Sequence, residues 1–110
     1  MIILTYSEFN ELVEKQLKLL KDMLAIKAGE YSPDIDRLES FKSAARLQGT
    51  TPMKALRGMM AKHTVSVYDM IEDESLNVAR WDEKITDSIA YLLLLKGLIM
   101  EEVEHAKHIH

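Results

Sequence analysis

The segment from Trp81 to Met100, WDEKITDSIAYLLLLKGLIM, limits the possible folds of this chain more than any other stretch. On a helical wheel its apolar side chains cover two faces instead of a single stripe. A helix that is apolar all round is normally buried within its assembly. We therefore expect this segment to lie in the middle of a helical bundle, or to offer its second face to another chain.

The remaining sequence favours an all-α fold. The chain has 110 residues, which suits one domain, and 47% of them are apolar, which is enough for a core. It contains only 4 Gly and 2 Pro, so long helices are favoured over a sheet of many short strands. We expect one domain over residues 1–110, an antiparallel bundle of about four helices, with a frayed C-terminal end at 105–110.

Capping signals define the first two helical pieces. Thr5 and Glu8 have the spacing of a capping box, in which two side chains satisfy free backbone donors at a helix start. Apolar residues then recur at helical spacing up to Gly29, which is a typical helix stop. A shorter second piece runs up to Gly49.

The other two pieces follow from similar signals. Thr51 and Pro52 have the order of an N-cap and a first helical residue. The acidic run at 72–75 ends this third piece. The fourth piece begins between residues 75 and 80 and continues to about His105.

Charge and cysteine content argue against several classes of protein. The net charge is −4 and the basic residues are scattered, whereas a nucleic-acid-binding face needs clustered Lys and Arg. The chain has no cysteine, which excludes disulfides and thiolate metal sites and fits a reducing cytoplasm. The N-terminus lacks the pattern of a signal peptide, and the apolar run at 91–100 is too short to span a membrane. We expect a cytoplasmic protein without membrane partners.

The two faces of the fourth helix carry different residues. The expected core stripe consists of Ile85, Ile89, Leu92, Ile99 and Met100. Glu83 and Asp87 fall on the opposite side, at one end of a second apolar face formed by Ala90, Tyr91, Leu94 and Leu98. One small bundle does not need so much apolar surface. We therefore expect a homo-oligomer, a dimer or higher, with the second face as its seam.

The acidic pair allows two interpretations. Carboxylates at i and i+4 on one helix, as at Glu83 and Asp87, can share a hard cation such as Mg²⁺. Acids near a helix N-terminus also interact favourably with the helix dipole and often have no other role. Spacing alone favours the second interpretation.

The third helix supplies a second group of candidates. Lys62, His63 and Ser66 lie close together on it, and a lysine with a hydroxyl could hold a phosphate. Lys62 could equally form an ion pair with Asp87 or Glu83 across the bundle. A lone histidine such as His63 is more often a packed, hydrogen-bonded residue than a ligand. Glu30, in the loop after the first helix, is a further candidate metal ligand.

These residues also resemble a known family, the small helical phage and prophage proteins called nucleotide modification associated domain type 1. The resemblance rests on Lys27-Ala28-Gly29-Glu30-Tyr31 in the loop, on Lys62, His63 and Ser66, and on Glu83, Lys84, Asp87 and Tyr91. It covers roughly residues 15–100. The family is similar in turn to the MazG-like nucleoside triphosphate pyrophosphohydrolases, which bind Mg²⁺ through carboxylates on helices. The acids here are spaced differently, and Ala90 stands where the family has asparagine.

The resemblance implies a phage-type protein that handles nucleotides and possesses a Mg²⁺-dependent pyrophosphohydrolase-like activity. Glu83, Asp87 and Glu30 would then hold the metal ion. Lys62 and His63 would be catalytic, and Lys62, Ser66 and Tyr91 would contact the nucleotide. The alternative is a non-catalytic helical interaction protein. In that case the lysine, the histidine and the carboxylates form a buried network that fixes the register of the helices.

Overall fold

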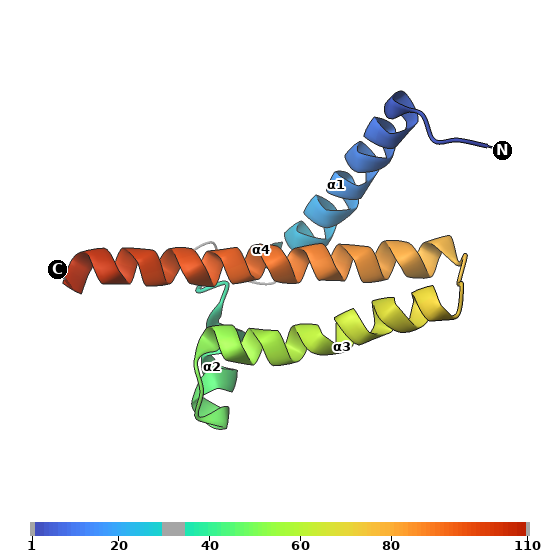
Figure 1. The fold of residues 1–110 in the computed structure, drawn as a ribbon. Coiled ribbons are helices and arrows are strands. Elements are labelled where there is room, and N and C mark those ends of the chain that lie inside the picture. Colours follow the sequence, from blue (N-terminus) through green and yellow to red (C-terminus); the bar gives the residue numbers. More distant parts are fainter. Residues whose placement is uncertain (1, 30–34, 110) are drawn as a thin grey trace.

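The computed structural model describes residues 2–29 and 35–109, and throughout these two stretches the regular structure is helical. Four helices follow one another in the chain (Figure 1): α1 Tyr6–Gly29, α2 Glu39–Gln48, α3 Pro52–Glu72 and α4 Val78–Ile109. The predicted all-α fold of four helices is therefore confirmed, and the bounds agree closely with the capping signals.

The predicted caps form at the starts of α1 and α3. The Glu8 backbone N–H donates to the Thr5 hydroxyl at 3.1 Å, and the Thr5 N–H donates back to the Glu8 carboxylate at 3.3 Å. The Thr51 hydroxyl accepts from the Lys54 N–H at 3.3 Å, with Pro52 as the first residue of α3. Each cap satisfies donors that the first helical turn leaves free, so local sequence defines both starts.

The ends of α2 and α4 have different local support. Gly49 follows α2 with φ 64°, in the left-handed region, and its N–H donates to the Ala45 carbonyl. Helix α4 extends to Ile109, and the expected fraying over 105–110 stays a prediction. This last stretch contains no glycine or proline, and an ion pair of 3.3 Å between Lys107 and Glu104 supports it locally.

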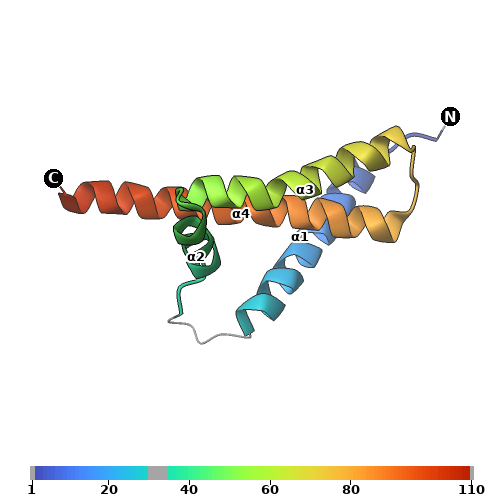
Figure 2. The ribbon, with the colours of Figure 1, turned by 90° about the horizontal axis from the view of Figure 1, so that it is seen from below.

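Helix α4 is the longest helix, and both α1 and α3 pack against it. Helices α3 and α4 lie side by side and antiparallel, and α2 packs against α3 (Figures 1 and 2). Helix α1 crosses α4 obliquely: its N-terminal end lies away from α4 in Figure 1, and its C-terminal end lies away from α4 in Figure 2. The C-terminal end of α4 projects past α2 and α3 in both views. Much of α4 is therefore left uncovered.

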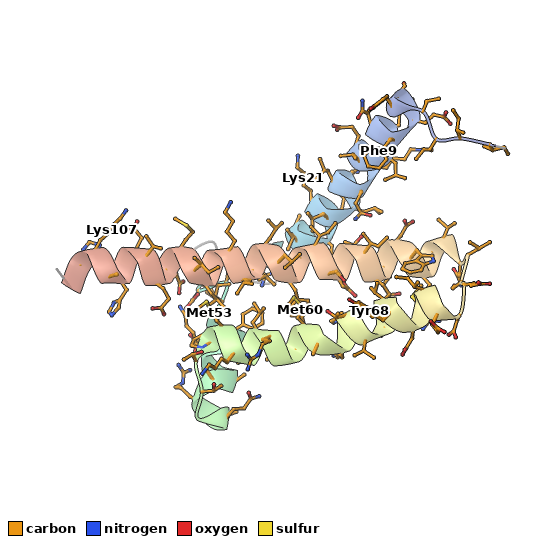
Figure 3. All side chains as sticks on the ribbon, viewed as in Figure 1. Phe9, Lys21, Met53, Met60, Tyr68 and Lys107 are labelled. Atoms are coloured by element: carbon orange, nitrogen blue, oxygen red, sulfur yellow. The ribbon has the colours of Figure 1, made fainter. Side chains whose placement is uncertain are left out.

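The hydrophobic core lies where α2, α3 and α4 meet. Its buried members are Leu38, Phe41, Leu56 and Leu98, and Leu56 is fully buried. Several partly buried side chains pack against them, including Met60, which lies between α3 and α4 (Figure 3). The core is small for a chain of this length.

The two apolar faces of α4 have the opposite roles to those expected. The face with Tyr91 and Leu98 packs against the core, so the proposed dimer seam is an intramolecular contact. The expected core stripe is largely exposed: Ile85, Leu92, Ile99 and Met100 are between 40% and 55% accessible, and Ile89 is half-buried. The cause is that α2 and α3 both pack on the same side of α4.

Among the described residues, one polar side-chain contact helps to attach α1 to α4. The Gln16 amide donates to the Thr86 hydroxyl at 2.8 Å, and Thr86 is buried beneath it. Leu20 is the one buried apolar side chain that α1 supplies among its described residues. No helix of the described stretches combines the length and the apolarity needed to cross a bilayer.

Candidate functional site

The contact between α3 and α4 brings together three of the residues singled out in the sequence. His63 Nδ1 lies 3.7 Å from Asp87 Oδ2, and the two side chains are only 15% and 22% exposed. The Tyr91 ring stacks at a tilt on the imidazole, with 5.1 Å between centroids. Antiparallel packing places these residues opposite one another, since His63 lies midway along α3 and Asp87 lies one turn before Tyr91 on α4.

This His63–Asp87–Tyr91 cluster is joined to the core by an aromatic contact. Phe41 of α2 meets Tyr91 edge to face at 6.4 Å between ring centroids. An edge-to-face pair adds roughly 0.5–1.5 kcal/mol to the energy of burial. The tyrosine is therefore held on both sides, which fixes its position relative to the histidine.

The polar atoms of the cluster are incompletely satisfied. His63 Nδ1 is shielded from solvent and makes no hydrogen bond within the described part of the chain. At 3.7 Å it lies beyond the usual hydrogen-bond range of about 2.7–3.2 Å from the Asp87 carboxylate. A buried nitrogen without a partner costs roughly 1–3 kcal/mol. Such a nitrogen can accept a hydrogen bond from a ligand after a small movement of either side chain.

Other candidate residues lie apart from this cluster. Lys62 and Glu83 are exposed, and neither forms an ion pair within 4.0 Å in the described stretches. Ser66 is half-buried on α3. Glu30 lies outside the described residues, as does Tyr31 of the predicted loop. The predicted ion pair from Lys62 to Asp87 or Glu83 is thus absent, because the lysine faces solvent.

The carboxylates offer limited support for a metal ion. Within the described ranges no group of three or more His, Cys, Asp and Glu side chains is placed to hold one. Glu83 and Asp87 remain one turn apart on α4. Mg²⁺ in proteins often uses one or two carboxylates and completes its shell with water and phosphate oxygens. The pair fits that role only if a substrate supplies the remaining ligands.

A groove opens between the diverging halves of α1 and α4. Its volume is 720 Å³, and its apolar lining consists of Leu4, Leu12, Leu19, Val78 and Ile85. Charged side chains surround this floor: Glu8, Glu11, Asp22, Asp82, Lys15 and Lys18. None of the residues predicted for nucleotide or metal binding belongs to it. The sequence did not predict this groove, because it depends on the angle between two helices distant in the chain.

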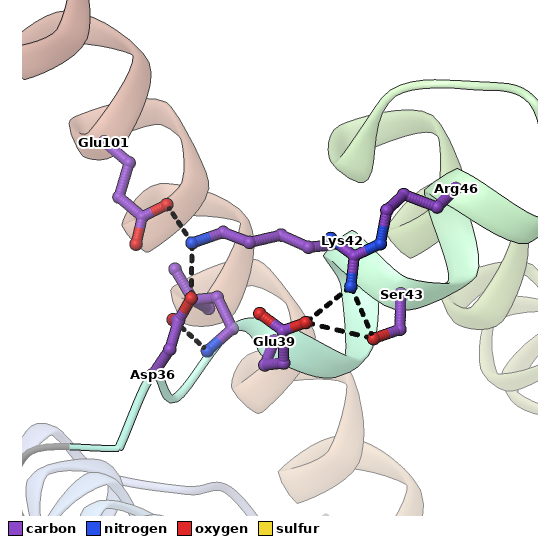
Figure 4. Close-up of polar contacts among 7 residues, drawn as sticks. Asp36, Glu39, Lys42, Ser43, Arg46 and Glu101 are labelled. Carbon is purple, nitrogen blue, oxygen red and sulfur yellow. Dashed lines mark hydrogen bonds and ion pairs between the residues drawn. The ribbon is translucent and has the colours of Figure 1, made fainter.

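A second polar cluster ties the start of α2 to α4 (Figure 4). Lys42 pairs with Asp36 and, at 2.9 Å, with Glu101. The hydrogen bond from Lys42, together with one from the Leu38 N–H, lowers the pKa of Asp36 below its usual value. The same two carboxylates raise the pKa of Lys42. Every charge in this cluster has a partner, so we assign it a structural role.

Comparison of the chain with known proteins finds no relative. The chain matches no protein-family model, no curated protein and no solved structure.

Proposed function

We propose that this chain acts by self-association, as a non-catalytic helical interaction protein. The supporting observation is the exposed stripe of Ile85, Leu92, Ile99 and Met100 on α4. Contiguous apolar surface of this kind commonly marks an interaction site. The His63–Asp87–Tyr91 cluster then fixes how α3 and α4 pack. The predicted homo-oligomer is retained in this proposal, with the opposite face of α4 as its seam.

Sedimentation velocity tests the proposal directly. We expect the wild-type chain to be dimeric or larger within a range of about 1–100 μM, where many specific complexes form. Ile99→Asp should weaken association at least tenfold, because the new carboxylate would have to be buried against apolar groups. The matched control is Val65→Asp, which changes a residue of similar exposure on α3. A monomeric wild type over the whole range would refute self-association.

The nucleotide-handling function is a second proposal, and the unpartnered His63 nitrogen beside Asp87 favours it. In this proposal Glu83 and Asp87 share a Mg²⁺ ion with the phosphates, and Glu30 is a further ligand. Lys62 neutralises phosphate charge, while His63, Ser66 and Tyr91 contact the nucleotide. The basis for these roles is the resemblance to the phage family described above. Both that setting and a cytoplasmic location stay predictions.

A thermal-shift screen of Mg²⁺ or Mn²⁺ against a nucleotide panel tests this second function. A ligand present at about a hundred times its Kd stabilises the folded state by about 2.7 kcal/mol, which corresponds to a rise of many degrees in a small domain. We expect the shift to need both metal and nucleotide, and to disappear in Asp87→Asn. Glu102→Gln, which removes an exposed carboxylate about four turns further along α4, should keep it. No shift with any combination would contradict nucleotide binding.

A further inference from the structure

One continuous stripe runs along the uncovered side of α4. Its positions are separated alternately by four and three residues, the spacing of a coiled-coil seam: Val78, Asp82, Ile85, Ile89, Leu92, Lys96, Ile99 and Val103. Six of the eight are apolar, and the four at 85, 92, 99 and 103 are each at least 40% exposed. We call this set the α4 seam. At a rise of about 1.5 Å per residue it is about 38 Å long.

The two ends of the α4 seam have different surroundings. At the N-terminal end, Val78, Asp82 and Ile85 form the α4 side of the groove beside α1. At the C-terminal end, Ile99 and Val103 are exposed, and the end of α4 that follows Glu102 projects beyond α2 and α3 (Figures 1 and 2). The N-terminal end of the α4 seam therefore lines the groove, and its C-terminal end leads into the projecting part of the helix.

We propose that a second copy of this chain covers the α4 seam, with the two α4 helices antiparallel. The projecting C-terminal end of each α4 then lies in the groove between α1 and α4 of its partner. This inference rests on the proposed self-association and specifies its interface. The contact is isologous, because a two-fold axis relates the two copies. The free end of each copy then lies in the groove of the other copy.

The register follows from the positions of the apolar residues. When the two-fold axis passes at the level of Leu94, Ile85 faces Val103 of the partner subunit, and Ile89 faces Ile99 of the partner subunit. Leu92 then faces Lys96 of the partner subunit, whose long aliphatic stem can cover it. Every apolar position from 85 to 103 meets an apolar side chain or such a stem. A shift by one heptad leaves some of these positions without a partner.

Charge also favours this occupant of the groove. Four carboxylates and two lysines line it, so its net charge is −2. The projecting end of α4 carries the exposed Lys107 on the same side of the helix as Val103. In the proposed register Lys107 of the partner subunit lies beside Asp82. Lys107 projects from the free end of α4 (Figure 3), and among the described residues it pairs with the exposed Glu104 alone, an interaction that is weak in solvent.

The same residues disfavour a parallel pair. In a parallel arrangement Lys96 would meet Lys96 of the partner subunit at the centre of the seam. Like charges at such positions destabilise a coiled coil and direct the choice of partner and orientation. The free end of each helix would also lie beside the other free end, and both grooves would stay empty. The antiparallel arrangement avoids both problems.

Cysteine cross-linking tests the antiparallel arrangement of the two α4 helices. The sequence has no cysteine, so every disulfide formed involves the introduced residues. Two single variants are prepared separately, Asp82→Cys and Ala106→Cys, with a size tag on one of them. We expect oxidation to give a disulfide-linked dimer only when the two proteins are mixed. Positions 82 and 106 face each other across the proposed seam, whereas each position lies far from its own copy. Ile89→Cys mixed with Ile99→Cys provides a second, independent pair in the middle of the seam.

The outcomes separate this inference from the proposed function. A mixed disulfide from either pair, with little from each variant alone, supports the antiparallel seam. If Ile89→Cys cross-links to itself and the mixture adds nothing, the helices are parallel and the inference is refuted, although self-association stands. A reduced protein that sediments as a dimer but never cross-links in either pair also refutes the seam. A monomer in sedimentation overturns both proposals together.

Discussion

Leu56→Ala is expected to lower the free energy of unfolding by about 2–5 kcal/mol. Leu56 is fully buried on α3 and belongs to the core cluster shared by α2, α3 and α4. Truncation removes buried methyl groups and leaves a cavity that the neighbouring helices can fill only in part. Domains of this size are commonly stable by only about 5–15 kcal/mol, so the loss is a large share of the total.

Urea unfolding followed by circular dichroism measures this effect. Leu47→Ala is the matched control, because Leu47 is a leucine on α2 with 89% of its surface exposed. We expect the control to change the unfolding free energy by less than about 0.5 kcal/mol. Equal midpoints for the two variants would mean that Leu56 is not a core residue.

Phe41→Ala is expected to cost about 3–5 kcal/mol and to release α2 from α3 and α4. Phe41 is 4% exposed and contacts Tyr91 of the His63–Asp87–Tyr91 cluster. Helix α2 has only 10 residues, and an isolated helix shorter than about 12–15 residues is marginal in water. Loss of its main apolar anchor should therefore unfold it locally.

Amide hydrogen exchange distinguishes local release from general destabilisation. In Phe41→Ala we expect protection to fall most in α2, while the α3–α4 pair retains most of its protection. Phe41→Leu keeps an apolar side chain of similar volume and should lose much less stability, about 1.5 kcal/mol or less. Uniform loss of protection across all four helices would show that Phe41 does not act through α2.

The sequence predicted the helices well because their boundaries depend on local interactions. Thr5, Gly49 and Thr51 act on backbone groups within a few residues, and each occupies the predicted cap. The fraying expected over 105–110 stays a prediction, although α4 extends to Ile109. Terminal position alone suggested it, while nothing in the local sequence breaks the helix.

The candidate site was predictable only in part. Only the resemblance to the phage family suggested that His63 and Asp87 belong to one site, and the packing of α3 on α4 brings them to 3.7 Å. Spacing could not reveal that Lys62 and Glu83 face solvent. No sequence pattern predicted the contact between Gln16 and Thr86, because 70 residues separate the two in the chain.

The sequence by itself therefore determined four helices, their caps and the presence of two apolar faces on α4. Tertiary structure alone decided which face is buried. The face of Tyr91 and Leu98 and the face of Ile85 and Ile99 are similarly apolar, so burial of either gains a comparable free energy. The choice depends on where α2 and α3 pack, which is a property of contacts between distant segments. Those contacts leave the second face of α4 and the groove beside α1 free for a partner.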